Sequence, residues 1–199
     1  QLERHSFQAH GSGKSGIIQV TRCGQEVLER TACEIEEKTG NIIVRFEVGF
    51  PARGRTIQAG ELVKILYQYL PACVEKALYY KNMDRNAVKQ AAELSVDQEY
   101  IREQLKKEGL IAFVADGSIL PRESGVSQRP MKDAVPFVSP DSMKVTMKLP
   151  YKGGLTGMGI RKGITLVVGG GYHGKSTLLK ALESGVYPHI AGDGREYVV

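Results

Sequence analysis

A glycine-rich stretch, GGGYHGKSTLLKAL (Gly169–Leu182), restricts the possible folds of this chain more than any other feature. It has the spacing of a phosphate-binding loop, in which a glycine is followed by four residues and then by Gly-Lys-Ser. Such a loop needs a strand before it and a helix that begins at its lysine, because backbone N–H groups and the helix dipole then face one anion. The apolar run Ile164–Val168 predicts the strand, and Ser176–Ser184 predicts the helix. The sequence therefore predicts a strand–loop–helix unit.

The side chains of this loop suit a nucleotide that is bound together with Mg²⁺. Lys175 would reach the outer phosphates and neutralise charge that develops there, and it is the catalytic residue that we assign. The hydroxyl of Ser176 would hold the metal ion. The predicted nucleotide-binding residues are Gly169, Gly170, Gly171, Tyr172, His173, Gly174, Lys175, Ser176 and Thr177.

A second Gly-Lys-Ser stretch, HGSGKSG (His10–Gly16), does not meet the same requirements. The position that should hold its first glycine is Gln8, and the residues before it are polar. The run after Lys14, GIIQVTR, reads as a strand and not as a helix. We therefore do not expect an independent nucleotide site here. The stretch reads first as a flexible glycine turn; the alternative is an anion-binding turn that contacts nucleic acid or a neighbouring site.

Composition and charge are those of an ordinary globular protein. The 199 residues include 42% apolar and 25% charged residues, and the net charge of +5 permits a polyanionic partner without requiring one. The apolar run Leu110–Ala115 is far shorter than the roughly 20 residues that span a bilayer. We expect no secretory leader, since the first residues after Gln1 are mostly polar. Three scattered cysteines read as reduced thiols, so we expect a cytoplasmic protein without a membrane partner. The cysteines are Cys23, Cys33 and Cys73.

Strand patterns dominate the first third of the chain, and helical patterns follow. Thr31–Glu37 and Asn41–Val48 flank a Lys-Thr-Gly turn, which predicts a hairpin. A helix is predicted over Glu61–Leu70. Pro71, the next residue, either kinks this helix or lies in the first turn of a new one. Three residues are expected to set the bounds of later helices: Asp84 caps one that runs through Leu94, Ser95 opens a capping box for the next, and Gly109 ends that helix in a left-handed conformation.

The amino-acid composition and periodicity change between Asp116 and Asp141, which indicates a long loop. Four prolines, several serines and glycines, and little periodicity mark this region. A loop of this length is usually functional or mobile. We place a domain boundary here, between residues 1–130 and 131–199. The alternating segment Ser142–Leu149 then predicts a strand, with Val145, Met147 and Leu149 on one face.

Several motifs together resemble the family of predicted ATPases of the ABC class. They are GQEVLERTA, PARGR, AFVADGSILPRESGVS, GMGI, GGGYHGKSTLLKALE and GVYPHIAGDGREYVV. The resemblance covers nearly the whole chain, including the GSGKSG turn. It implies an α/β fold of the ABC-type P-loop NTPases, preceded by an α+β region over residues 1–130.

The resemblance also implies an activity and its cofactors. The protein would bind ATP with Mg²⁺ and hydrolyse it, couple the nucleotide state to a partner, and work as a homodimer. Bulky residues before the last loop glycine, Tyr172 and His173, are unusual in cassette proteins but expected in this family. The second acidic strand, the signature motif and the switch histidine would lie beyond Val199. We therefore expect a fragment that binds ATP but lacks part of the hydrolytic machinery.

Three further groups of residues leave alternatives open. Asp116 ends an apolar strand as a magnesium-binding acid would, but it precedes the loop, and Asp-Gly is also a good turn. Tyr151 or Phe137 could stack on adenine, although core or surface packing explains either residue as well. The four histidines have no zinc-ligand spacing; they are His5, His10, His173 and His189.

A different class of function competes with the ATPase. Arg53 and Arg55 in PARGR could bind phosphates, and the positive net charge and the GSGKSG turn would then fit a module that binds RNA or single-stranded DNA, with ATP as a regulator. A P-loop kinase is a third possibility, but no acceptor-binding motif is visible in the sequence.

Overall fold

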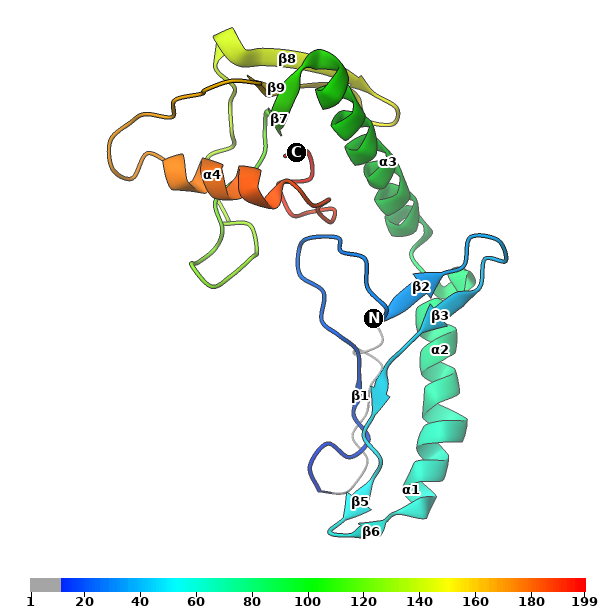
Figure 1. Cartoon of the computed structure of the whole chain (residues 1–199). Coiled ribbons are helices and arrows are strands. Elements are labelled where there is room, and N and C mark those ends of the chain that lie inside the picture. Colours follow the sequence, from blue (N-terminus) through cyan, green and yellow to red (C-terminus); the bar gives the residue numbers. More distant parts are fainter. Residues whose placement is uncertain (1–11) are drawn as a thin grey trace. The chain divides into compact units, whose positions relative to one another are not determined.

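The computed structural model describes residues 12–199, and its internal contacts divide them into two compact units (Figure 1). Unit 1 contains the described residues before Cys23 together with Glu29–Val88. Unit 2 contains Cys23–Leu28 and Lys89–Val199. The histidines His5 and His10 and the first residue of the GSGKSG turn lie outside the described residues.

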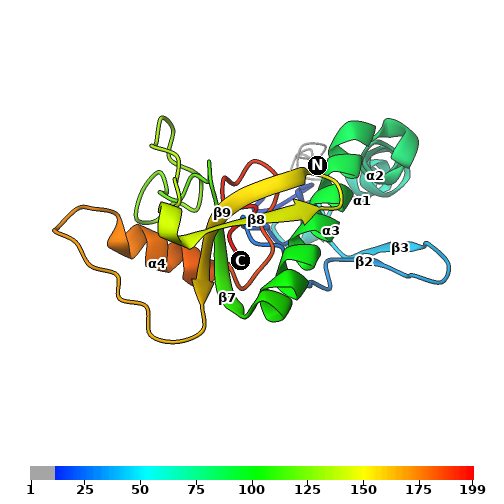
Figure 2. The same ribbon diagram turned by 90° about the horizontal axis from the view of Figure 1, so that it is seen from above.

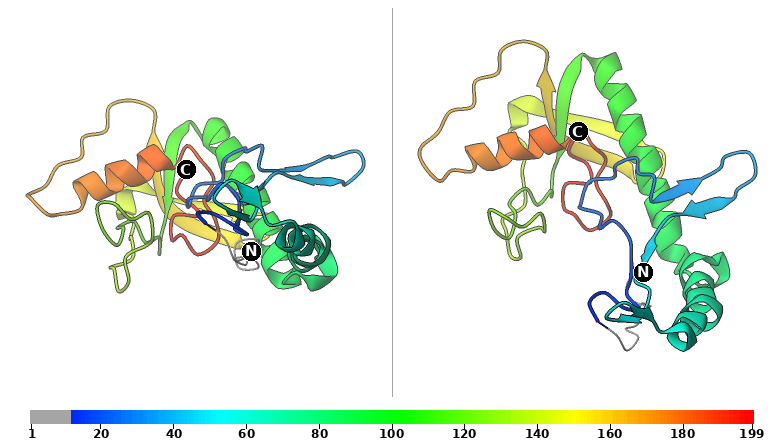
Figure 3. Two further views of the ribbon diagram at one scale, coloured as in Figure 1. Left: turned by 90° about the horizontal axis from the view of Figure 1, so that it is seen from below. Right: turned by 60° about the horizontal axis from the view of Figure 1, so that its bottom comes forward.

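Short antiparallel strand pairs make up the first part of unit 1. The pairs are β1 (Ile18–Gln19) with β4 (Glu47–Val48), β2 (Cys33–Ile35) with β3 (Ile42–Val44), and β5 (Ala52–Arg53) with β6 (Thr56–Ile57). The β2–β3 pair confirms the predicted hairpin, and Figures 1 and 3 show it as a projecting ribbon. Gly40 closes its turn at φ +71°, a conformation that glycine adopts without strain.

The helical part of unit 1 is one nearly continuous rod. It consists of α1 (Ala59–Lys64), the π-helical turn η2 (Ile65–Tyr69) and α2 (Leu70–Leu78), and it ends at the extended residue Tyr79, before the short 3₁₀ turn η3 (Tyr80–Asn82). Pro71 lies in the first turn of α2, directly after the π-helical turn, and the backbone stays helical on both sides of it. Ile18, Cys73 and Ala77 form the buried core between the strands and this rod.

The helix α3 (Arg85–Glu108) is longer than the sequence predicts. The Oδ1 atom of Asp84 accepts the first N–H groups of the helix at 3.0 and 3.1 Å, which confirms the predicted cap. The helix then continues through Ser95, so the predicted capping box is wrong. The carboxylate of Asp97 is instead almost fully buried and accepts the backbone N–H groups of Tyr151 and Lys152, each at 2.9 Å. Gly109 ends the helix at φ +66°, as predicted.

Three antiparallel strands form the sheet of unit 2, in the order β7 (Leu110–Ala115), β9 (Gly153–Arg161), β8 (Lys144–Leu149), as Figure 2 shows. The strands β7 and β8 were predicted, whereas β9 was not, because four of its nine residues are glycines and glycine has low strand propensity. Two of these glycines permit close packing. A Cβ on Gly157 would lie 2.4 Å from the carbonyl oxygen of Val114, and one on Gly159 would lie 2.7 Å from a methyl group of Val145.

Each face of this sheet has its own apolar cluster, because successive strand residues point to opposite faces. Phe113 packs with Ile101 and Leu105 of α3. Val114 packs with Met158 and with Ala181 of α4 (Lys175–Ser184). The end of the chain runs beside β7, where Phe113 and Val199 exchange N–H···O bonds of 2.7 and 2.9 Å.

The contacts between β7 and β9 lie within one compact unit. They join residues 110–115 to residues 157–161 within unit 2. The compact units divide between Val88 and Lys89, whereas the domain boundary near residue 130 stays a prediction from the sequence. Among the described residues, those from Asp116 to Pro140 form no named helix or strand, in agreement with the predicted long loop. The 3₁₀ turn η4 (Asp141–Met143) then leads into β8.

We predict that Asp97→Ala lowers the free energy of unfolding by about 1–3 kcal/mol, because two backbone N–H groups lose their acceptor. Urea unfolding followed by circular dichroism measures this change. The exposed neighbour Glu99 provides the control, and Glu99→Ala should leave the midpoint nearly unchanged. Equal midpoints for the two variants would show that the carboxylate of Asp97 does not anchor α3.

Candidate nucleotide-binding site

The N-terminus of α4 faces the glycine-rich loop. The helix begins at Lys175, one residue before the predicted start, which confirms a helix after the loop. Its N-cap is Gly174, at φ +75°, and no described side chain caps it. The first N–H groups of a helix have no intrahelical acceptor, so they can bind an anion. This arrangement is the one that a phosphate site needs.

Lys175 folds back over the loop that precedes it. Its Nζ donates to the carbonyl oxygen of Gly169 at 2.7 Å and also to that of Gly170. The imidazole Nδ1 of His173 lies 2.7 Å from the carbonyl oxygen of Gly171. A Cβ on Gly170 would lie 3.1 Å from the imidazole ring, so a larger residue there would crowd His173. The ammonium group of Lys175 is thus bonded to carbonyl groups of the loop that precedes it.

Tyr172 has an unusual backbone conformation for a residue with a side chain. Its φ is +61°, in the left-handed region, and its side chain is fully exposed. Conformations of this kind cost energy and are concentrated at functional sites. Ser176 and Thr177 follow in the first turn of α4.

The predicted strand Ile164–Val168 is wrong for this chain. Among the described strands, none pairs with it, and Ile164, Leu166 and Val168 are largely exposed. Figures 1 and 2 show the segment as part of a long open connection between β9 and α4. An apolar run becomes a strand only when a neighbouring strand takes its backbone hydrogen bonds, and the three-stranded sheet offers no such neighbour at this position.

An apolar pocket of about 440 Å³ lies beside the loop. It is bounded by the start of α4 and by a segment of the long loop, and none of its described lining residues carries a carboxylate. The lining residues are Leu120, Pro121, Val135, Pro136, Phe137, Val138, Val167, Val168, His173, Gly174, Lys175, Thr177 and Leu178. Of the two aromatic candidates, Phe137 lines this pocket, whereas Tyr151 lines a separate one.

Asp116 is engaged in hydrogen bonds from Ser139. One carboxylate oxygen accepts the backbone N–H of Ser139 at 2.6 Å, and the other accepts its hydroxyl at 3.0 Å. Gly117 has φ +85°, which confirms the turn that follows. Among residues 12–199, no group of three His, Cys, Asp or Glu side chains could hold a metal ion.

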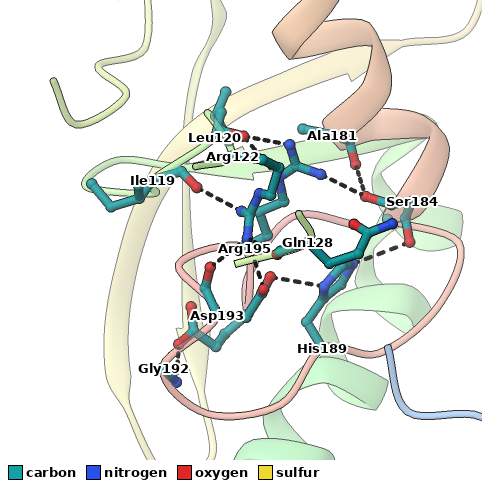
Figure 4. Close-up of polar contacts among 12 residues, drawn as sticks. Ile119, Leu120, Arg122, Gln128, Ala181, Ser184, His189, Gly192, Asp193 and Arg195 are labelled. Atoms are coloured by element: carbon teal, nitrogen blue, oxygen red, sulfur yellow. Dashed lines mark hydrogen bonds and ion pairs between the residues drawn. The ribbon is translucent and has the colours of Figure 1, made fainter. Parts of the chain in front are cut away.

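A buried charge cluster lies at the other end of α4, and the sequence did not predict it (Figure 4). Asp193 is fully buried, and its carboxylate lies 2.8 Å from a guanidinium nitrogen of Arg122 and 2.9 Å from Nδ1 of His189. Arg195 donates to the carbonyl oxygen of Leu120 and to the hydroxyl of Ser184, the last residue of α4. Burial, followed by repulsion from Arg122, lowers the pKa of Arg195 to about 10.

A weak signal for this cluster exists in the sequence. The turn GDGR places an acid and a base on either side of a glycine, but nothing there indicates that both are buried. Gly194, at φ +79°, lies so close to Ile119 that a Cβ would approach its side chain to 2.8 Å. The turn is therefore packed against the start of the long loop.

The second Gly-Lys-Ser stretch forms a compact turn in unit 1. Ser12 donates its backbone N–H to the carbonyl oxygen of Ala52 at 2.8 Å, and the hydroxyl of Ser15 accepts the N–H of Ala52 at 3.3 Å. A Cβ on Gly49 would lie 1.7 Å from the carbonyl oxygen of Lys14, so only glycine fits there. The segment after the turn pairs as β1 and forms no helix, as predicted, although β1 is shorter than expected.

The fold and the loop define an ATPase class, and the comparisons with known proteins identify the family. A family model described as the P-loop domain of the ABC ATPases matches residues 84–199, and one described as the N-terminal part of ATPases of the ABC class matches residues 1–81. The chain belongs to this family. It therefore has an α/β fold of the P-loop NTPase class, and ATP binding and hydrolysis are the general activity of its class.

A curated relative comes from an archaeon. An uncharacterized protein of Methanocaldococcus jannaschii, MJ1628, is 29% identical over 144 residues, which cover 68% of this chain and 32% of the relative. The chain thus corresponds to about a third of that protein. In the part of the chain that the structure describes, no helix has the length and apolar character needed to cross a membrane.

We predict that Asp193→Asn lowers the free energy of unfolding by about 3–5 kcal/mol, because Arg122 loses its buried counter-charge. Chemical unfolding measures the loss. The control is Asp141→Asn, since the side chain of Asp141 is 95% exposed and contacts Lys144 at the surface. If both variants unfold at the same denaturant concentration, the buried cluster does not stabilise this unit.

Proposed function

We propose that the chain binds MgATP at Gly169–Thr177. The observation that carries this proposal is the uncapped N-terminus of α4, which opens onto a glycine loop that also holds the ammonium group of Lys175. Backbone N–H groups, a helix dipole and a lysine together form the donor set that recognises a nucleotide triphosphate. Membership of the ABC-class ATPase family supports ATP as the nucleotide.

The remaining ligands divide between the metal and the base. Ser176, in the first turn of α4, would hold Mg²⁺ through its hydroxyl group, as in other P-loop proteins. When bound, the metal would neutralise charge on the outer phosphates. The adenine base would occupy the apolar pocket beside the loop, where Phe137 offers an aromatic surface.

Hydrolysis would be slow in this chain on its own. An acid that orients the attacking water is needed beside the γ-phosphate. None of the described carboxylates that follow the loop lines the pocket beside it. Asp193 is paired with Arg122, Glu196 accepts the N–H of Gly192 at 2.6 Å, and Glu183 lines a different pocket. Coupling to a partner and pairing as a homodimer are likewise proposals for the complete protein.

We expect Lys175→Ala to weaken ATP binding by about 10- to 100-fold, because a charged hydrogen bond to phosphate is lost. Lys14→Ala should leave the affinity unchanged, since Lys14 precedes a strand and has no helix dipole behind it. Titration calorimetry with MgATP on both variants measures the difference. An equal loss in the two variants would place the GSGKSG turn in the nucleotide site.

We also expect MgATP to raise the melting temperature without measurable phosphate release. A ligand at about 100 times its Kd adds roughly 2.7 kcal/mol to the stability of the folded state. A thermal melt and a phosphate-release assay on the same sample test both parts. Brisk turnover that Lys175→Ala abolishes would contradict the proposal and indicate that Asp116 or another acid completes the site.

A second function, the binding of RNA or single-stranded DNA, has one specific observation in its favour. The turn that carries Lys14 is hydrogen-bonded to Ala52, directly before Arg53 in the β5–β6 hairpin. Lys14, Arg53 and Arg55 are exposed. The segments 12–16 and 49–57 contain no acidic residue. This part of unit 1 is therefore a basic surface of the kind that contacts phosphate backbones.

We predict that replacing both Arg53 and Arg55 with Ala weakens binding of a single-stranded RNA. The slope of log affinity against log salt concentration should become shallower by about 1.4, which is about 0.7 for each lost phosphate contact. Gel shifts across a salt series measure both values. Replacing Lys106 and Lys107, which are exposed at the end of α3, removes the same charge and serves as the control. Equal effects in the two double variants would exclude a specific role for the hairpin.

A further inference from the structure

The hydrogen bonds of Asp116 connect the sheet to one wall of the pocket beside the phosphate loop. Asp116 follows β7 directly, and its own N–H donates to the carbonyl oxygen of Thr156 in β9 at 2.9 Å. Its two carboxylate oxygens accept the N–H and the hydroxyl of Ser139. The side chain is thus held at the sheet and holds a residue that is distant in the sequence.

Ser139 lies two residues after Phe137 and is almost fully buried. Phe137 itself is held by two backbone hydrogen bonds in the same region. Its N–H donates to the carbonyl oxygen of Ser118, and its carbonyl oxygen accepts the N–H of Gly117, both at 2.8 Å. The segment that contains Phe137 is therefore fastened to the residues immediately after β7.

The neighbours of Phe137 contribute little to holding this wall in place. The side chains of Val135 and Val138 are 86% and 72% exposed, so the packing of this segment is confined to Phe137, which contacts the apolar cluster around Val114. Irregular segments of this kind are held mainly by the few hydrogen bonds that they make. The two bonds from Ser139 to the carboxylate of Asp116 are charge-assisted, whereas the backbone bonds of Phe137 are neutral. Charge-assisted hydrogen bonds are roughly twice as strong as neutral ones.

We propose that Asp116 and Ser139 form a latch that positions Phe137 against the base of a bound nucleotide. Asp116 is then a positioning residue and not a metal ligand. This inference rests on the proposed function, because it assumes that the pocket beside the loop takes the base. It predicts that the latch sets the affinity for the base and leaves the affinity for the phosphates unchanged.

Two ligands separate these contributions in one experiment. Titration calorimetry compares MgATP with inorganic tripolyphosphate in the same Mg²⁺ buffer, for the wild type and for Asp116→Asn, Ser139→Ala and Phe137→Ala. We expect each variant to lose about tenfold in affinity for ATP, the scale of one stacking contact, while affinity for tripolyphosphate changes by less than about twofold. The variant Ser139→Thr, which keeps the hydroxyl, should retain most of the ATP affinity.

Two further variants complete the design. The double variant Asp116→Asn/Phe137→Ala should bind ATP no more weakly than Phe137→Ala alone, because both substitutions remove the same contact. Asp141→Asn alters an exposed acid at the end of the same loop and should have no effect. Circular dichroism confirms that each variant is folded, and Ser139→Ala provides the test if Asp116→Asn does not fold.

Other outcomes would overturn the inference in distinguishable ways. Equal losses for ATP and tripolyphosphate in Asp116→Asn, with a steeper requirement for Mg²⁺, would make Asp116 a metal ligand. Unchanged ATP affinity in Asp116→Asn and Ser139→Ala, beside a loss in Phe137→Ala, would leave the base pocket in place and remove the latch. A wild type that binds neither ligand would refute the proposed function as well.

Discussion

The packing of several segments of unit 2 depends on the buried carboxylate of Asp193 and its counter-charge. The carboxylate of Asp193 is inaccessible to water, and the guanidinium group of Arg122, which comes from the long loop, neutralises it at 2.8 Å. Arg122 also donates to carbonyl groups of the long loop, and the neighbouring Arg195 joins that loop to the end of α4. An uncompensated charge in such a place would cost several kcal/mol. The loop, the C-terminal turn and the helix that follows the phosphate loop can therefore adopt this packing only together.

The same buried cluster connects helix α4 to the long loop. The N-terminus of α4 carries Lys175, and its last residue, Ser184, contacts Arg195. The carbonyl oxygen of Leu120, which Arg195 holds, belongs to a residue that lines the pocket beside the phosphate loop. Helix α4 and the apolar wall of this pocket thus share one support, which reaches the pocket only through Leu120.

Local patterns in the sequence predicted the parts of the fold that depend on local physics. The β2–β3 hairpin, the Asp84 cap, the Gly109 terminus and α4 each follow from turn residues and periodicity within a few positions. The features that the sequence analysis missed depend on contacts between residues that are distant in the sequence. The strand β9 is rich in glycine because Val114 and Val145 approach it closely, and the side chain of Asp97 serves the β8–β9 turn and no helix cap. The burial of Asp193 likewise depends on residues about 70 positions away.

The open connection before the phosphate loop has a consequence for the protein in solution. Ile164–Val168 is rich in exposed β-branched side chains, pairs with none of the described strands, and carries no charge and no proline. Segments of this kind add readily to the strand edges of other molecules. If two such segments paired through their backbones, the chains would associate, and this aggregation would increase with protein concentration. A lysine introduced into this run would oppose such pairing through charge repulsion between the chains.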